Sequence, residues 1–289
     1  LDRIGKGVRG TPRDALLAAS VPAERLGRAF GFHRAMDYLG SGLGPAIGAL
    51  ALAFGVSIRG LFALAVIPSV FVLAMIAFGV QNERLASPNA AKRPLPWRDL
   101  PGRLRGLLIA SALLAVTSVH DAFLVLWIND RLDGSVRDVL LLFAVVNIVR
   151  AVVAMFGGEL TDRIGTLPTI IIGWLSRIAL LVFMASAPSV LDAGQASALV
   201  VALTATMAWS GPAELTLLTR AAPEGNRGAV LGTYHMLTGL LMLPGVAAFG
   251  LLWQQLGANT ALLAAATGTG LAAATLILLS FTPSRSSDE

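Results

Sequence analysis

The sequence contains no cysteine, so neither disulfides nor cysteine-ligated metals are available to it. Charged residues are also scarce: they make up 13% of the 289 residues, about half the share found in a soluble domain. So few charges would cover a water-facing surface poorly. The 55% of hydrophobic residues and the mean hydropathy of +0.74 instead indicate a chain whose solvent is mostly lipid.

Patterns that would indicate other classes of membrane protein are missing too. No stretch shows the alternation of a barrel strand. The three histidines, His33, His120 and His235, lie about 90 or more residues apart, so they form no HExxH-type metal pair. The sequence has neither a GxSxG nucleophile elbow nor a selectivity filter. We therefore expect neither an enzyme nor a channel, and neither a metal nor a cofactor.

Apolar segments of membrane-spanning length recur along the chain. A helix that crosses the hydrocarbon core needs about 20 residues. Residues 1–20 end in an apolar stretch and are interpreted as the remainder of one more helix. The sequence thus predicts an all-α integral membrane protein with about nine transmembrane helices. The complete segments are residues 29–54, 60–80, 105–128, 138–157, 168–187, 195–217, 229–254 and 259–281.

One long polar stretch, QNERLASPNAAKRPLPWRDLPGRLR, divides these segments into two groups. It contains six basic residues and two acidic ones, and the positive-inside rule places such a stretch in the cytoplasm. The net charge of +5 is explained by loops of this kind rather than by a nucleic-acid partner. We expect the remainder of an N-terminal bundle at 1–80, a cytoplasmic linker at 81–104, a C-terminal six-helix bundle at 105–282 and a cytoplasmic tail at 283–289.

An internal repeat supports this division. Residues 21–35 resemble residues 221–236: Pro22, Gly27 and Gly31 correspond to Pro223, Gly228 and Gly232. The repeat aligns the partial helix and its successor with the fourth and fifth helices after the linker. Three further helices are therefore expected before residue 1, which would complete two bundles of six helices.

Two motifs resemble those of the major facilitator superfamily of secondary transporters. Gly31, Gly40, Gly44, Pro45 and Gly48 have the spacing of the family's antiporter motif in its fifth helix, with Ala49 in place of the final glycine. The stretch GELTDRIG, with Gly158, Asp162, Arg163 and Gly165, resembles the family's loop motif between the eighth and ninth helices. Its following basic pair is replaced by Thr166 and Leu167, so this copy is degenerate.

A third stretch, RIGKGVRGTPRDALLA, resembles the fourth helix of one bacterial branch of the family. The alternative is that residues 2–6 form the family's other loop motif, which would make residues 10–28 the third helix. That segment holds six charged residues, too many for a full lipid-exposed span, and the repeat also favours the fourth helix.

The resemblance implies the major facilitator fold and transport by alternating access around a midplane site. We expect export of a small organic solute, such as a drug or metabolite, coupled to inward proton flow. Uptake of a small organic anion with protons is the alternative. A monomer that crosses the cell membrane several times is expected, with substrate, protons and the lipid bilayer as its partners.

The antiporter-like glycines share one helix face, because Gly40, Gly44 and Gly48 are spaced four apart. Small residues let another membrane helix approach closely, and Pro45 permits a kink. The simpler interpretation is a packing seam. The resemblance implies in addition that the seam meets the opposite bundle and slides or seals during transport.

Charged groups in the spans are candidates for coupling or for lining the substrate pathway, since a charge inside a membrane faces a cavity or a partner. In 29–54, Asp37 is the deepest and Arg34 is placed to pair with it, although an interfacial cluster with His33 is equally compatible. Arg13 ends a basic stripe with Arg3, Lys6 and Arg9, beside Asp14. The remaining candidates are His120, Asp121, Asn147, Arg150, Arg177, Glu214 and His235.

The loop motif predicts a contact between the bundles. A carboxylate is stabilised at a helix N-terminus by unpaired N–H groups and the helix dipole. By the bundle symmetry, Asp162 should lie close to the start of the fifth helix at Gly27, with Arg163 near a neighbouring acid such as Glu24. The simpler alternative is that this stretch only makes a tight turn at Gly165.

Overall fold

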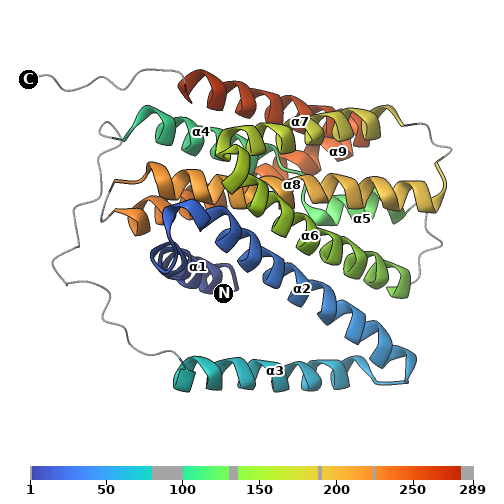
Figure 1. The fold of residues 1–289 in the computed structure, drawn as a ribbon. Helices are drawn as coiled ribbons and strands as arrows, with labels where there is room; N and C mark the ends of the chain where they lie inside the picture. The colour runs from blue at the N-terminus through green and yellow to red at the C-terminus, as the bar shows by residue number, and fades with distance from the viewer. Residues whose placement is uncertain (1, 80–99, 130–135, 188–190, 224–225, 281–289) are drawn as a thin grey trace, which may run out of the picture.

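A computed structural model describes residues 2–79, 100–129, 136–187, 191–223 and 226–280, and all of its regular elements are helices (Figure 1). The linker expected at 81–104 lies largely outside the described residues, and the tail expected at 283–289 lies wholly outside them. The elements are α1 (Asp2–Ala19), η1 (Ala23–Arg25), α2 (Leu26–Ala53), α3 (Ile58–Gly79), α4 (Gly102–Thr117), α5 (Asp121–Asn129), α6 (Val136–Ile164), α7 (Thr166–Ser186), α8 (Ala193–Ala221) and α9 (Arg227–Ser280).

Each predicted span falls on a helix, but α1, α2 and α3 are not among the described helices that are long and apolar enough to cross a membrane. By length and apolar composition, five helical stretches of the described chain are able to cross a membrane, beginning at Leu104, Asp138, Thr166, Ala193 and Arg227. The last is 54 residues long, and it contains the two expected crossings. They meet at Gly257, whose φ of 84° and ψ of 166° interrupt the helix. Glycine adopts this conformation without the steric cost that other residues bear.

The expected single helix over 105–128 is broken, which corrects the sequence prediction. Helix α4 ends at Thr117 and α5 begins at Asp121. Thr117 Oγ1 donates to the carbonyl of Leu113 (2.8 Å), four residues earlier on the same helix, so its side chain is turned back onto α4. Across the break, His120 Nδ1 accepts from the N–H of Ala122 (3.2 Å) and caps the start of α5.

The backbone of α9 closes on the end of α4 from two sides. A Cβ at Gly245 would lie 2.5 Å from the carbonyl oxygen of Val116, and one at Gly268 would overlap the side chain of Thr117. Both membrane-crossing segments of α9 therefore pack against the last residues of α4. Apolar spacing alone gave no indication of this break.

Helices α2 and α6 cross in backbone contact at Gly27, Gly31 and Gly158. A Cβ at Gly31 would lie 2.7 Å from the carbonyl oxygen of Ala154 and 2.9 Å from the Cα of Gly158. Further along, the two helices continue through buried Ala35, Ala151 and Ala154, which join Ala208 of α8 in a cluster of small side chains. Close approach of this kind is how membrane helices associate without a hydrophobic driving force.

The expected seam of Gly40, Gly44 and Gly48 makes no such contact. Nothing in the described chain lies within 4 Å of a Cβ built at any of the three glycines. The contact face of α2 instead includes Gly42, where a Cβ would lie 3.2 Å from the carbonyl oxygen of Ala144. Two positions apart on a helix is about 200°, so Gly40 and Gly44 lie on nearly the opposite face from Gly42, whereas Gly31 of the same motif packs on α6.

Corresponding glycines of the two halves of the internal repeat each lie at a contact between helices. Gly31 packs on α6, and the corresponding Gly232 packs on α1, where a Cβ would lie 3.4 Å from Thr11 Cγ2. Helix α1 includes residues 2–6 and ends at Ala19, followed by the turn before η1. Residues 10–28 therefore do not form one helix, as the third-helix alternative required.

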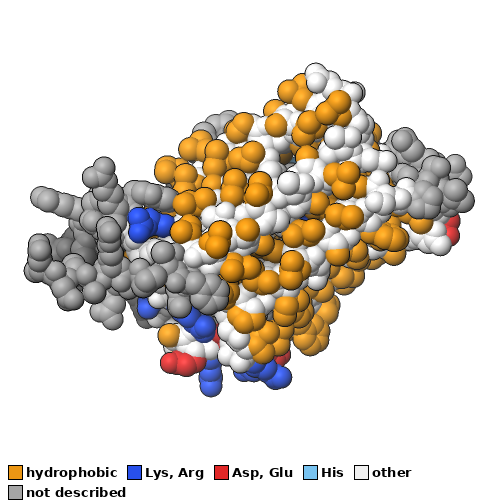
Figure 2. Space-filling model, turned by 90° about the horizontal axis from the view of Figure 1, so that it is seen from above, with side chains coloured by type: hydrophobic (Ala, Val, Ile, Leu, Met, Phe, Trp, Pro, Cys, Tyr) orange, Lys and Arg blue, Asp and Glu red, His pale blue; other side chains and the backbone are white. Residues whose placement is uncertain are grey.

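Helix α3 lies at the lower edge of Figure 1, apart from the other helices, and its large side chains are exposed. Apolar side chains also cover most of the face in Figure 2, and Lys and Arg side chains gather toward its left end. At that end α2 begins and α6 and α8 finish (Figure 1). We call it the basic end; the sequence prediction makes it cytoplasmic.

The glycine crossing yields a prediction for a matched pair of alanine variants. We expect Gly31→Ala to destabilise the protein by about 1–3 kcal/mol, because the added methyl meets backbone that cannot rotate away. Gly44→Ala faces open space and should leave stability unchanged or raise it slightly. Thermal unfolding of the two purified variants in detergent measures the difference. Equal unfolding temperatures would show that the crossing is not tight.

Candidate functional site

Asp14 and His235 join α1 to α9. The carboxylate of Asp14 is 1% exposed, and its Oδ2 lies 3.0 Å from His235 Nε2. Arg13 Nε donates to Asp14 Oδ1 at 3.2 Å. A buried carboxylate is costly without such partners. The contact therefore holds together two helices that the sequence assigned to different bundles.

Asp37 shares the guanidinium of Arg13. Arg13 Nη1 lies 3.4 Å from Asp37 Oδ2, and His33 Nδ1 lies 3.7 Å from the same oxygen. The predicted pairing of Arg34 with Asp37 is not formed within the described chain. Arg13 on α1 reaches the carboxylate instead, a partner that spacing along α2 could not reveal. The side chains of Arg3, Lys6 and Arg9, which complete the expected stripe, lie outside the described residues.

Arg34 is partly buried between these groups and makes no hydrogen bond or ion pair with any described residue. Its electrostatic neighbours are Asp14, Asp37, Tyr38 and Tyr234. They come from α1, α2 and α9, so the guanidinium lies where the two groups of helices meet.

A second ion pair lies at the break between α4 and α5. Arg150 of α6 donates to both oxygens of Asp121, at 3.0 and 2.7 Å. The guanidinium also lies over the ring of Tyr38 on α2, 5.8 Å from its centroid. Bidentate pairing fixes the geometry of both side chains. A small cavity of about 20 Å³ beside Asp121 has room for about one water molecule.

Two other predicted site residues of this region, Asn147 and His120, make hydrogen bonds to the backbone. Asn147 is buried and donates to the carbonyl of Phe143 on its own helix (2.8 Å). His120 caps α5 as described above. Neither side chain is directed to a ligand by any described contact.

Glu214 lies inside the C-terminal group of helices, buried by α7, α8 and α9. Its Oε1 accepts from Trp174 Nε1 (3.1 Å) and Ser210 Oγ (3.0 Å), and its Oε2 accepts from Tyr234 Oη (3.3 Å). Arg177 is 4% exposed, and its Nε has no partner among the described residues. Each oxygen of the Glu214 carboxylate thus accepts from at least one neutral donor, so this carboxylate has partners without a ligand.

The sequence analysis missed Trp174 and Tyr234. Both are aromatic side chains with a polar end, and such ends usually find a hydrogen-bond partner when buried. With two tyrosines in the whole chain, their placement was a usable signal.

Asp162 lies at the start of α2, as predicted. Its Oδ1 accepts from the N–H of Gly27 (2.9 Å) and its Oδ2 from the N–H of Arg28 (2.8 Å). The motif is not a loop, however, because α6 continues to Ile164 and the turn is confined to Gly165, with φ of 97°. Asp162 therefore comes from the last helical turn of α6.

Arg220, which the sequence analysis missed, completes this contact from the end of α8. It donates to the carbonyl of Ala23 at 2.9 Å and to Asp162 Oδ1 at 3.2 Å. A basic residue in the last turn of a helix is favoured by the dipole, and that position was the available signal. Arg163 does not pair with Glu24: its partner is Glu159 on its own helix, at 2.5 Å.

Arg28 also pairs with Glu159, across 3.1 Å. We call Asp162, Arg220, Arg28 and Glu159 the basic-end contact. It ties the beginning of α2 to the ends of α6 and α8.

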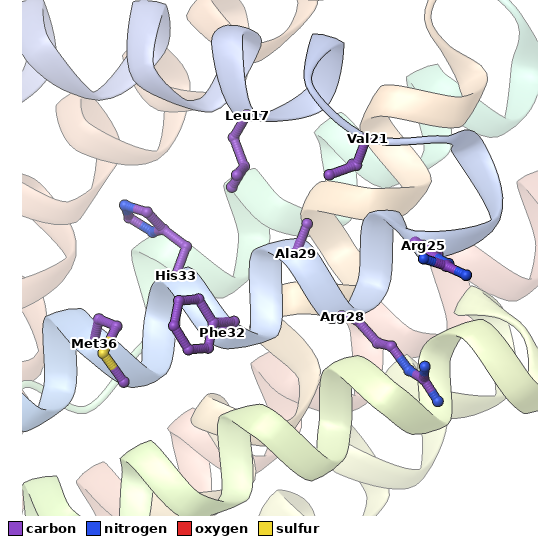
Figure 3. Close-up of a pocket in the computed structure, with 8 residues that line it drawn as sticks. All are labelled: Leu17, Val21, Arg25, Arg28, Ala29, Phe32, His33 and Met36. Carbon is purple, nitrogen blue, oxygen red and sulfur yellow. The ribbon is translucent and has the colours of Figure 1, made fainter. Parts of the chain in front are cut away.

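A surface groove between α1 and α2 has a volume of about 500 Å³ (Figure 3). Its walls are mainly apolar, with Phe32, Met36 and Leu17 directed toward it. Of the predicted site residues, His33 alone lines it. His33 is also the ion-pair partner of Asp37, so the groove borders the charged cluster, whereas neither Asp14 nor His235 lines it.

Comparison with known sequences decides the family. The sequence model of the Major Facilitator Superfamily matches residues 2–246. The chain belongs to this superfamily. Its all-α, multi-pass membrane architecture is that of a transporter family and not of an enzyme.

Two relatives illustrate the match. The major facilitator chain is 26% identical over 264 residues to an uncharacterised MFS-type transporter of Methanocaldococcus jannaschii, covering 88% of this chain and 64% of the relative. It thus spans less than two thirds of that protein's length. A crystal structure of a bacterial homologue of the iron transporter ferroportin, in an outward-facing state, shares the fold with a TM-score of 0.62 and 18% identity. That likeness covers 92% of this chain and 67% of the other.

The basic-end contact of this major facilitator chain is testable by crosslinking, since the sequence has no cysteine. Gly27 is unsuitable, because a Cβ there would lie 2.5 Å from the carbonyl oxygen of Gly158. We expect Arg28→Cys with Glu159→Cys to crosslink efficiently through a short bifunctional thiol reagent. Adding Asp162→Asn should lower the yield, because the carboxylate stabilises the helix start by about 0.3–2 kcal/mol.

Arg59→Cys with Glu159→Cys is the matched control, since Arg59 lies at the start of α3, beyond the far end of α2. A yield no higher than that of the control pair, at every pH tested, would show that the contact is absent in solution.

Proposed function

We propose that this protein is a secondary transporter that moves a small organic solute across a membrane by alternating access. The observation that carries the proposal is the position of the polar contacts between the helices before and after the linker. Asp162 and Arg220 meet the start of α2, and His235 meets Asp14. Both contacts join surfaces that must separate if the basic end opens.

The nature of these contacts supports reversible closure. Hydrogen bonds to a helix start and ion pairs form and break without rearranging the cores of either group of helices. They also lie in partly water-accessible positions, because Arg220 is 33% exposed and His235 is 24% exposed. A state closed at the basic end would be outward-facing if that end is cytoplasmic.

Export coupled to inward proton flow is the leading form of this proposal. The antiporter-like spacing suggests it by resemblance, and the cluster offers groups that can exchange protons: Asp14 with His235, and Asp37 with His33. Carboxylates and imidazoles are the side chains suited to this role in a membrane. The transporter would act as a monomer in the cell membrane.

Transport by a purified protein in proteoliposomes tests the proposal. We expect saturable flux of at least one solute from a panel of drugs and metabolites, driven by an imposed pH gradient. Flux should vanish when an ionophore dissipates the gradient. Ohmic conductance with no saturation would instead indicate a channel.

Asp37→Asn tests the coupling. Asp37 has 45% of its side chain exposed, so it can gain or lose a proton without a large change in packing. We expect at least a tenfold loss of gradient-driven flux, while solute exchange without a gradient persists, because a neutral amide cannot carry a proton. Glu24→Gln, the same change at an exposed residue, should transport normally. Loss of exchange as well would make Asp37 a structural partner of Arg13 and His33.

Uptake of a small organic anion together with protons is the second candidate. The observation that favours it is Arg34, a cation without a hydrogen-bonding partner among the described residues. The direction of the net flux in the same proteoliposomes separates the two candidates.

A further inference from the structure

We propose that Arg34 and Tyr38 form the anchoring site for a carboxylate or phosphate group of the transported solute. The proposal rests on the proposed transport function and adds the chemical class of the substrate. It assigns a ligand to two side chains whose contacts leave their polar groups available.

The first step is the availability of Arg34. A guanidinium has five N–H donors and is always charged, and none of the five is used by a described residue. Arg150 nearby is held by both oxygens of Asp121, and Arg13 is divided between Asp14 and Asp37. Of the three arginines at the meeting point of α1, α2, α6 and α9, Arg34 is therefore the one left to bind something else.

The second step is why the neighbouring acids leave it free. Asp14 is occupied by Arg13 and His235, and Asp37 by Arg13 and His33. Both carboxylates lie within electrostatic reach of Arg34 and lower the cost of placing its charge there. Neither one makes the bidentate contact that a planar guanidinium favours. The site is thus stabilised as a cation without being filled.

The third step is the matching donor on the same helix face. Tyr38 is four residues after Arg34, so the two side chains are neighbours on the surface of α2. The Tyr38 hydroxyl makes no hydrogen bond with any described residue, although its ring is in contact with Arg150. The other tyrosine near Arg34, Tyr234, already donates to Glu214. One guanidinium and one hydroxyl are a suitable donor set for an oxyanion.

The position of the site also fits a transported group. Arg34 and Tyr38 belong to α2, while Tyr234 of α9 and Arg150 of α6 face them from the other group of helices. A solute held here would touch both groups and would be released when they separate. The apolar groove of Figure 3 lacks such donors beyond the arginines at its rim.

Arg177 is the strongest competing candidate, because it too is buried and has an unpaired Nε. It faces Glu214 inside one group of helices, among Trp174 and other core side chains. It therefore balances a buried charge within that group and does not lie between the two groups. The two arginines give different outcomes in the experiment below.

The test is thermal unfolding of the purified full chain in detergent, followed through its five tryptophans. Sodium benzoate, succinate, citrate and phosphate are titrated separately at constant ionic strength. A ligand that binds only the folded state raises the unfolding temperature with saturation. We expect saturable stabilisation by at least one of the four anions.

Variants assign that effect to residues. Arg34→Gln should lower the affinity for the anion by about tenfold or more, because a charge-assisted bidentate contact is lost. Arg34→Lys keeps the positive charge but loses the two-pronged guanidinium geometry, so it should bind the anion more weakly than the unmodified protein. Tyr38→Phe removes one hydroxyl donor and should lower the affinity for the anion about fivefold. Arg59→Gln, at an exposed arginine of α3, should bind as the unmodified protein does. If Arg34→Gln does not fold, Arg34→Lys and Tyr38→Phe carry the test.

The outcomes separate a binding role from a structural one. Unchanged anion affinity in the Arg34 and Tyr38 variants, loss of the effect in Arg177→Gln alone, or no saturable effect of any of the four anions would overturn the inference. A lowered unfolding temperature without ligand, with anion affinity intact, would give Arg34 a structural role only. Since binding needs no transport, a chain that binds the anion but moves no solute would contradict the proposed function and would leave only the anion site at Arg34 and Tyr38.

Discussion

The backbone crossing of α2 and α6 is the constraint on which the rest of the arrangement depends. Gly27 and Gly31 of α2 face Gly158 of α6, and no Cβ atom lies between the two helix backbones. The helices therefore approach more closely than larger residues would allow. This closeness is what lets a side chain as short as Asp162 reach the backbone N–H groups of Gly27 and Arg28 from the end of α6. In lipid, such packing and hydrogen bonding replace the hydrophobic drive that joins helices in water. The contact of Asp162 with the start of α2 thus depends on three positions that lack a side chain.

Charged groups in this chain lie both within the C-terminal group of helices and between the two groups. Within the C-terminal group, Glu214 is fixed by three neutral donors, and its cluster holds α7, α8 and α9 together. Between the groups, charges meet partners from another helix: Asp14 with His235, Asp162 with Arg220. Apolar packing joins helices both within and between the groups, since Leu26 and Phe30 of α2 belong to one cluster with residues of the C-terminal group. The polar pairs at Asp162 and Asp14 add to this packing between the groups.

The sequence predicted the helices well, and the reason is physical. A span must be apolar over a fixed length, so composition alone locates it, and eight of the nine expected spans correspond to continuous helical runs. The exception, over 105–128, breaks where the α9 glycines Gly245 and Gly268 pack on the end of α4, a contact that no local pattern encodes. The glycine motif shows the same limit. Four-residue spacing correctly put Gly40, Gly44 and Gly48 on one face, but which face meets α6 is decided by Gly31 and Gly42.

The sequence analysis named several of the charged residues that meet in the structure, but it missed Trp174, Tyr234 and Arg220 and did not predict the pairing. The spacing along the helix suggested that Arg34 pairs with Asp37. In the structure, Arg13 of α1 donates hydrogen bonds to both Asp37 and Asp14 instead. The two carboxylates that pair with this guanidinium differ in their exposure to solvent. Asp14 is 1% exposed, so losing its partners would leave a buried charge, which is strongly unfavourable. Asp37 is 45% exposed and water can replace a partner there. A movement that draws α1 away from α9 therefore costs most at Asp14, and Arg13 and Arg34, the cations beside it, are the groups able to offset that cost.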